Sequence, residues 1–101
     1  MNMLLAVEFP AEPFNTLMRN EKVGEIIERI LETIKPSTAY FTELDGKRGG
    51  IFVVDVRSPA DVPFFAEPFY LNFNASCKFN ILMTPEELKT ARLDELGKKW
   101  G

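Results

Sequence analysis

Three side chains in this sequence could carry out acid–base chemistry: the carboxylates of Glu8 and Asp55 and the hydroxyl of Tyr40. A carboxylate enclosed by apolar neighbours has a raised pKa and can act as an acid or a base near neutral pH. A tyrosine beside it can orient a carbonyl group. We therefore predict a small-ligand pocket in which Glu8, Tyr40 and Asp55 are the catalytic candidates.

Three further polar residues are candidates for ligand binding. Lys78 and Asn80 alternate along one strand-like segment, which directs their side chains to one face. Glu67 lies within an aromatic segment, residues 62–73, and is also a second acid candidate. We interpret the aromatic residues around it as core, because no basic groove accompanies them.

A structural role for the same charged residues is favoured over the catalytic one. Glu8, Asp55 and Lys78 could form ion pairs at a dimer interface or at strand ends near solvent, while Tyr40 only packs there. Ion-pair networks perturb pKa values as well, so residue type alone does not separate the two roles.

The composition excludes several kinds of chemistry. There is no histidine among the 101 residues, which removes the usual general base and any Ser-His or Cys-His nucleophile. Histidine is also the commonest transition-metal ligand, and we predict neither a metal site nor a cofactor. Cys77 is the only cysteine, and its apolar strand neighbours favour a small core residue over a nucleophile.

The elements that position these residues are expected in the order βαββαβ, followed by a helix. Residues 3–9 form the first strand, and apolar residues at helical spacing predict a helix over 21–35, with Asn20 as its N-cap. Strands at 37–43 and 50–56 are joined through Asp45-Gly46, a strong hairpin signal.

The second half of the chain continues the pattern. Ser58 and Asp61 are alternative caps for a helix that ends near residue 72, and the last strand covers 76–83. A capping box at Thr84-Pro85-Glu86-Glu87 starts a C-terminal helix. We expect this helix to dock on its own subunit, and the alternative, with Trp100 anchoring a partner, stays open.

This order is the split βαβ, ferredoxin-like arrangement, an α+β sandwich whose first and third strands lie centrally in a four-stranded antiparallel sheet. A chain of this length predicts one domain over residues 1–101. Strand parity assigns the more apolar face to the helices; that face has Leu5, Val7, Phe9, Ala39, Phe41, Phe52, Val54, Val56, Cys77, Phe79, Ile81 and Met83.

The opposite face is mixed. It carries Leu4, Ala6, Glu8, Thr38, Tyr40, Thr42, Ile51, Val53, Asp55, Ser76, Lys78, Asn80 and Leu82. An exposed aliphatic patch of this kind marks an interface or a ligand site, and a twofold homodimer is the simplest cover. The partner we predict is therefore a second copy of the chain.

Other partner classes are disfavoured. The formal net charge is -3 and the basic residues form no stripe, which argues against nucleic acid. No apolar stretch is long enough to span a bilayer, so no membrane partner is predicted. A single cysteine is consistent with a reducing cytoplasm, where we expect the protein.

Several short motifs together resemble a family of small uncharacterised bacterial proteins of ferredoxin-like, dimeric α/β-barrel type, often labelled pantothenate synthetase. The motifs, which extend over nearly the whole chain, are Glu12-Pro13-Phe14-Asn15, Tyr40-Phe41-Thr42-Glu43, Ala66-Glu67-Pro68-Phe69, Met83-Thr84-Pro85-Glu86 and Leu93-Asp94-Glu95-Leu96-Gly97-Lys98-Lys99-Trp100. The resemblance implies two sheets that face each other, with small ligands bound between sheet and helices or inside the barrel.

The label implies ATP-dependent ligation, which needs a nucleotide-binding motif. The chain lacks histidine, and Gly46 and Gly49-Gly50 are expected in a hairpin turn, not in a phosphate loop between strand and helix. We therefore predict no pantothenate synthetase activity for this chain alone.

The favoured function is a non-catalytic or small-ligand-binding homodimer. The alternative is a cofactor-independent enzyme that performs an isomerase- or lyase-like proton transfer on a small organic acid or carbonyl compound. A third class, an accessory to a larger enzyme, also stays open.

Overall fold

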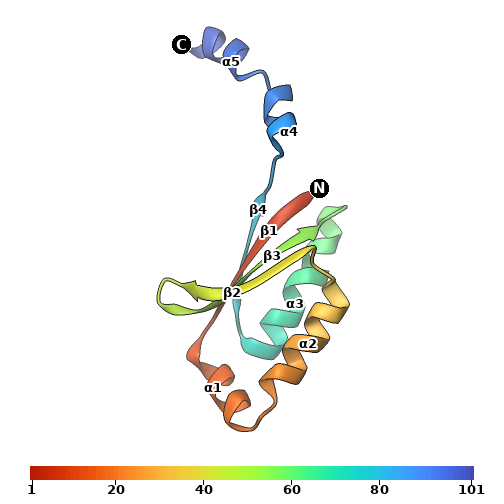
Figure 1. The fold of residues 1–101 in the computed structure, drawn as a ribbon, viewed down its shortest axis with the longest axis vertical. Coiled ribbons are helices and arrows are strands. Elements are labelled where there is room, and N and C mark those ends of the chain that lie inside the picture. Colours follow the sequence, from red (N-terminus) through yellow and green to blue (C-terminus); the bar gives the residue numbers. More distant parts are fainter.

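Four strands form one antiparallel sheet in the computed structural model, which describes all of residues 1–101. The strands are β1 (Asn2–Phe9), β2 (Thr38–Leu44), β3 (Lys47–Asp55) and β4 (Ser76–Ile81), and they lie side by side in the order β2-β3-β1-β4 (Figure 1). The two central strands are therefore the first and the third, as the sequence predicts. The fold is α+β.

The β2–β3 hairpin closes as the turn residues predict. Asp45 and Gly46 have φ angles of 52° and 76°, and two successive positive values define the type I′ turn that suits the twist of a hairpin. Tyr40 pairs with Ile51, which is the expected register. The expectation that Gly49 and Gly50 belong to the turn is wrong, because both lie inside β3 and are buried.

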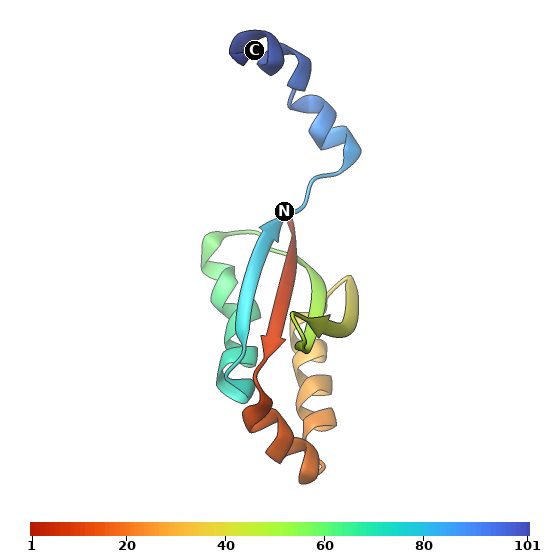
Figure 2. The same cartoon turned by 90° about the vertical axis from the view of Figure 1, so that its left-hand side faces the viewer.

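The helices between the strands cover one face of the sheet. They are α1 (Ala11–Arg19), α2 (Val23–Ile34), the short 3-10 helix η1 (Pro59–Asp61) and α3 (Val62–Phe73), with α2 and α3 packed along the strands (Figures 1 and 2). Ser58 and Asp61, predicted as alternative caps of the long helix, instead act together in a reciprocal capping box at η1, and α3 itself has no side-chain cap.

The start of the first long helix differs from the prediction. Residues 11–19 already form α1, and Asn20 caps the C-terminal end of α1 by donating its backbone N–H to the Thr16 carbonyl. Glu21 has a φ of 58°, so α2 cannot begin there and starts at Val23. The assignment of Asn20 as an N-cap is therefore wrong.

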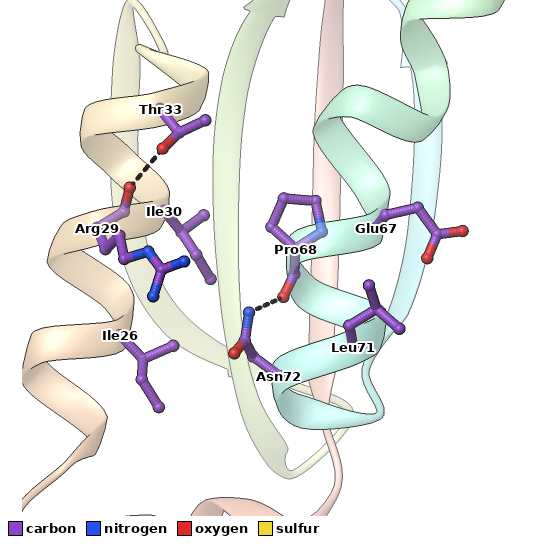
Figure 3. A pocket seen from close by; sticks show the side chains of 8 residues that line it. All are labelled: Ile26, Arg29, Ile30, Thr33, Glu67, Pro68, Leu71 and Asn72. Atoms are coloured by element: carbon purple, nitrogen blue, oxygen red, sulfur yellow. Dashed lines mark hydrogen bonds between the residues drawn. The ribbon is translucent and has the colours of Figure 1, made fainter.

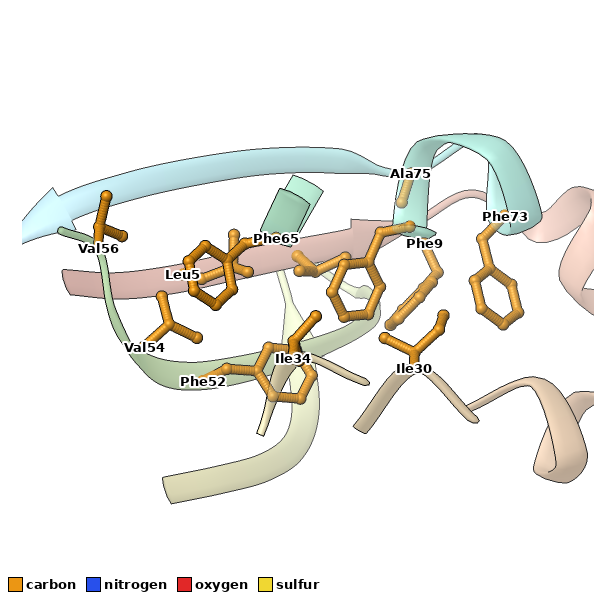
Figure 4. Close-up of a cluster of buried hydrophobic side chains, with 12 residues drawn as sticks. Leu5, Phe9, Ile30, Ile34, Phe52, Val54, Val56, Phe65, Phe73 and Ala75 are labelled. Atoms are coloured by element: carbon orange, nitrogen blue, oxygen red, sulfur yellow. The ribbon is translucent and has the colours of Figure 1, made fainter. Parts of the chain in front are cut away.

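The hydrophobic core lies between the sheet and the helices. Most of the strand residues predicted to face the helices do so. Twelve buried side chains form one cluster (Figure 4): Leu5, Val7, Phe9, Ile30, Ile34, Phe52, Val54, Val56, Phe65, Phe69, Phe73 and Ala75. Four residues assigned to this face are exposed, namely Ala39, Phe41, Ile81 and Met83. Ala39 and Phe41 lie on edge strand β2, Ile81 is the last residue of β4, and Met83 follows that strand, so no helix covers them.

After Leu82, whose backbone N–H donates a 3.0 Å hydrogen bond to the Asn2 carbonyl, the chain leaves the body of the fold. We call residues 82–101 the C-terminal arm; it contains α4 (Pro85–Thr90) and α5 (Leu93–Trp100). Both helices extend beyond the end of β4, away from α2 and α3 (Figures 1 and 2). The expected docking of this segment on its own subunit is wrong.

Local chemistry explains the helices of the arm. Thr84 and Glu87 form the predicted capping box, with hydrogen bonds of 2.9 and 3.1 Å between each side chain and the other backbone N–H. Arg92 has a φ of 57°, which ends α4 and separates it from α5, so two short helices replace the single one expected.

The arm makes the chain more extended than a compact domain of the same length. The radius of gyration is 17.0 Å, whereas a compact domain of this length has about 13 Å. The accessible surface is 7332 Å², against about 5800 Å² for a folded monomer of this mass. The single chain thus exposes about 1500 Å² more than expected. None of its helices has the length and apolar character required to cross a membrane.

Candidate functional site

The face of the sheet opposite the helices has an aliphatic centre. Leu4 pairs with Val53, and Ala6 pairs with Ile51, so four apolar side chains meet where β1 and β3 adjoin. All four are half-buried although no helix lies over them. Polar residues surround this aliphatic patch. We call the whole face of the sheet that no helix covers the open face.

Glu8 lies at one end of the open face and forms an ion pair. Its carboxylate is 3.8 Å from the Lys47 ammonium, and its side chain is 22% exposed. Its pairing partners across the sheet are Gly49 on β3 and Ser76 on β4. Glu8 therefore meets a cation from the hairpin and no second acid.

Asp55 lies at the opposite end of the same face. One oxygen accepts a hydrogen bond of 3.0 Å from the N-terminal ammonium, and the other accepts one of 3.3 Å from Arg57 Nε. These bonds, with that from the ammonium first, hold the pKa of Asp55 below its usual value. An acid with a lowered pKa is ionised at neutral pH and a weak base, so it is poorly suited to proton transfer.

The register separates the three catalytic candidates within one chain. Asp55 pairs with Asn2, and Glu8 lies six residues further along β1, which at 3.3 Å per residue is about 20 Å away. Tyr40 lies between them in the strand direction, on edge strand β2, and is 65% exposed. None of the five main cavities is lined by these three residues together.

Lys78 and Asn80 lie on the other edge strand, β4. They pair with Ala6 and Leu4, so both are on the open face as predicted, and both are exposed. Three strand spacings separate Lys78 from Tyr40 in the same row, about 14 Å. These two polar groups therefore flank the aliphatic patch from opposite edges.

Glu67 lies outside the open face, in a groove between α2 and α3 on the outer side of the helices. The groove has a volume of 280 Å³, and its lining includes Arg29 and Asn72 (Figure 3). Asn72 Nδ2 donates a 2.7 Å hydrogen bond to the Pro68 carbonyl, and the Glu67 side chain points away from α2. The structure thus does not bring Glu67 together with Glu8, Tyr40 or Asp55.

Cys77 faces the helices beside this region. Burial raises the pKa of its thiol to about 11, an effect that outweighs the lowering by the nearby Tyr70 hydroxyl. A thiol with this pKa stays protonated at neutral pH and is a poor nucleophile. The position agrees with the expected core role of Cys77.

A second candidate site involves residues that the sequence reasoning did not single out. A groove of 340 Å³ opens at the end of the sheet where α1 and α2 meet the hairpin, and Phe14, Phe41 and Arg48 are among its lining residues. Arg48 is paired with Phe9 on β1 and Glu43 on β2. Its guanidinium lies 4.6 Å from the centre of the Phe14 ring.

The sequence carried only a weak signal for this groove. Arg48 follows the hairpin turn, whereas Phe14 is thirty-four positions earlier, between the strand predicted over 3–9 and the helix predicted over 21–35. Only the packing of α1 against the end of β1 brings the two together, through a Phe9–Phe14 ring contact at 5.4 Å. A cation flanked by β-hairpin signals is too common to identify a site by itself.

Comparison with known proteins does not assign a family to this chain. No family model matches it, and no curated protein sequence matches it either. The resemblance drawn from the short motifs therefore stays a prediction. No three His, Cys, Asp or Glu side chains lie close enough together to hold a metal ion.

Proposed function

We propose that the chain is a ferredoxin-like domain that works as a homodimer, with the two open faces opposed as in a dimeric α/β barrel and each C-terminal arm laid on the other subunit. Its proposed role is binding of a small ligand, without catalysis. The observation that carries the proposal is the surface that one chain leaves uncovered.

The amount of that surface fits a dimer. An excess of about 1500 Å² per chain corresponds to about 3000 Å² in a twofold complex, within the range of obligate homodimers. The aliphatic centre of the open face and the arm would both contribute to this area. A second copy is the one partner certain to be present wherever the chain is made, and twofold pairing is the commonest arrangement.

The chemistry of the arm supports the same partner. Its apolar side chains recur at helical spacing on α5, where Leu93, Leu96 and Trp100 are all exposed in the single chain. Trp100, with 79% of its surface exposed, is the most prominent. An isolated helix of eight residues is marginal in water, so an arm with this stripe needs a surface to pack against.

The polar groups of the open face support binding over catalysis. Asp55 and Glu8 are each paired with cations, and the register places them at opposite ends of the face. This arrangement matches the ion-pair alternative better than a proton-transfer site. The cofactor-independent enzyme therefore remains the second candidate, and it would need groups from both subunits.

Light scattering coupled to size-exclusion chromatography tests the dimer. We expect a mass twice the 11.5 kDa of one chain at micromolar concentration. The double variant Leu93→Ser/Leu96→Ser should shift the mass towards the monomer, because both side chains would leave the interface. Neither residue is in the core cluster, so the circular dichroism of the body should be retained.

The matched control is Lys89→Ser/Lys98→Ser, which changes two side chains of the same arm outside its apolar stripe. This variant should remain dimeric. A monomeric wild-type chain at micromolar concentration would overturn the proposal. Equal dimerisation of the two double variants would show that the arm does not contribute to the dimer interface.

A further inference from the structure

An arginine without a carboxylate partner stands at the end of the sheet. Arg48 takes part in none of the ion pairs within 4.0 Å, although Glu43 is its direct neighbour across the hairpin. Its guanidinium is nevertheless held in place, by the Phe14 ring at 4.6 Å and by a 2.6 Å hydrogen bond from Nη1 to Asn15 Oδ1. Arginine has five N–H donors, so the remaining donors are free to bind an anion.

The groove beside this guanidinium, the Arg48 groove, has apolar walls. Its lining residues are Phe9, Phe14, Ile27, Phe41, Thr42, Arg48 and Gly49. The aromatic walls are fixed by the core, since Phe9 and Phe14 pack edge to face at 5.4 Å and Phe41 packs on Phe52 at 5.6 Å. Phe41 is still 51% exposed, so one ring face is available to a ligand.

We propose that the Arg48 groove binds a small organic carboxylate with an aromatic or aliphatic body, the carboxylate on Arg48 and the body against Phe14 and Phe41. This inference deepens the proposed small-ligand role and rests on it. It does not depend on the dimer, because every lining residue belongs to one chain.

The chemistry of the groove selects this class of ligand. A guanidinium binds a carboxylate through two parallel charge-assisted hydrogen bonds, and it repels cations. Inorganic phosphate would satisfy the charge but would leave the aromatic walls exposed to water. A volume of 340 Å³ is at the lower end of the range for ligand pockets, which favours a small acid.

Phenylacetate is a suitable probe, with phenylacetamide as its uncharged counterpart of nearly the same shape. In a ¹H–¹⁵N NMR titration of the full-length protein we expect saturable shifts at the Arg48 Nε–H and at the backbone amides of Thr42 and Gly49. Phenylacetamide should bind about 10-fold more weakly or worse, because it loses the charge-assisted bonds. Acetate should also bind more weakly, because it lacks the apolar body.

Two arginine variants separate a site at Arg48 from a general effect of charge. Arg48→Gln should weaken phenylacetate binding about 10-fold or more, whereas Arg57→Gln, at the other end of the sheet, should leave it unchanged. Phe41→Ser should weaken binding as well, while the dispersion of the spectrum reports that the fold is kept.

The result for ligand binding can be separated from the result for dimerisation. Light scattering on the same samples reports the oligomeric state, so loss of ligand binding in a dimeric protein counts against the groove alone. The proposal is overturned if phenylacetate gives no saturable shifts up to about 10 mM, if phenylacetamide binds equally well, or if Arg48→Gln binds as the wild type does.

Discussion

Replacing the single tryptophan tests the proposed dimer most sharply. In one chain Trp100 is 79% exposed and belongs to no core contact, so Trp100→Ala should leave the body of the monomer intact. If the partner subunit covers about 150 Å² of the indole, the gross hydrophobic gain is about 4 kcal/mol per side chain.

Only part of this gain is expected in the dissociation constant. Ordering the arm on a partner costs conformational entropy, and truncation of an interface tryptophan typically costs at least about 2 kcal/mol. A twofold dimer contains two arms, and both carry the substitution, so the dimer should lose about 4 kcal/mol of association free energy. That loss corresponds to about a 1000-fold rise in Kd.

Sedimentation equilibrium over a dilution series measures this Kd for the wild type, for Trp100→Ala and for the control Lys98→Ala on the same helix. The control should stay within about 3-fold of the wild type, because exposed charges contribute little. Wild-type fluorescence supplies an independent readout, since Trp100 is the only tryptophan. Its emission should move to longer wavelength on dilution through the dimer midpoint.

A wild-type Kd for Trp100→Ala would contradict burial of the indole by the partner subunit. So would a wild-type emission maximum typical of an exposed indole at concentrations where the protein is dimeric. Either result would mean that the arm remains in solvent and that the dimer, if present, uses the open face alone.

Two further predictions concern the single chain. Phe52→Ala should lower the free energy of unfolding by about 3–5 kcal/mol in urea titrations, because the ring is fully buried and stacks on Phe69 at 5.3 Å. The matched change Phe41→Ala, on edge strand β2, should lower it by about 1 kcal/mol. Equal losses in the two variants would contradict the packing. Since the pKa of Cys77 is raised from 9.0 to about 11, the folded chain keeps a thiol proton that the unfolded chain loses in this window. The free energy of unfolding should therefore fall as the pH rises from 9 to 11. The drop in urea midpoint between these two pH values should be smaller in Cys77→Ala than in the wild type; an identical drop would show that the thiol is not desolvated.

Features governed by neighbouring residues could be predicted from the sequence. Asp45-Gly46 determines the hairpin because both positions need positive φ, and that turn alone places Tyr40 opposite Ile51. The capping box at Thr84 and Glu87 likewise starts α4 irrespective of what α4 touches. Alternation of side chains then assigned Lys78 and Asn80 to the open face.

Features that depend on distant parts of the chain could not be predicted from the sequence. The candidate trio of Glu8, Tyr40 and Asp55 followed from shared parity, but parity says only which face a residue occupies, not how far along the strand it lies. The β1–β3 register, which pairs Asn2 with Asp55 and Gly49 with Glu8, puts the two acids at opposite ends.

The sequence by itself determined the strands, the hairpin and the division of the sheet into an apolar and a mixed face, because strand pairing and turn geometry act over a few residues. Only the tertiary structure decided that the C-terminal arm leaves its own body and that Arg48 meets Phe14 at the end of the sheet. An apolar stripe at helical spacing packs equally well on its own subunit or on another, so its pattern contains no information about which one. That choice depends on where the last strand ends and on which surfaces the other helices have already covered.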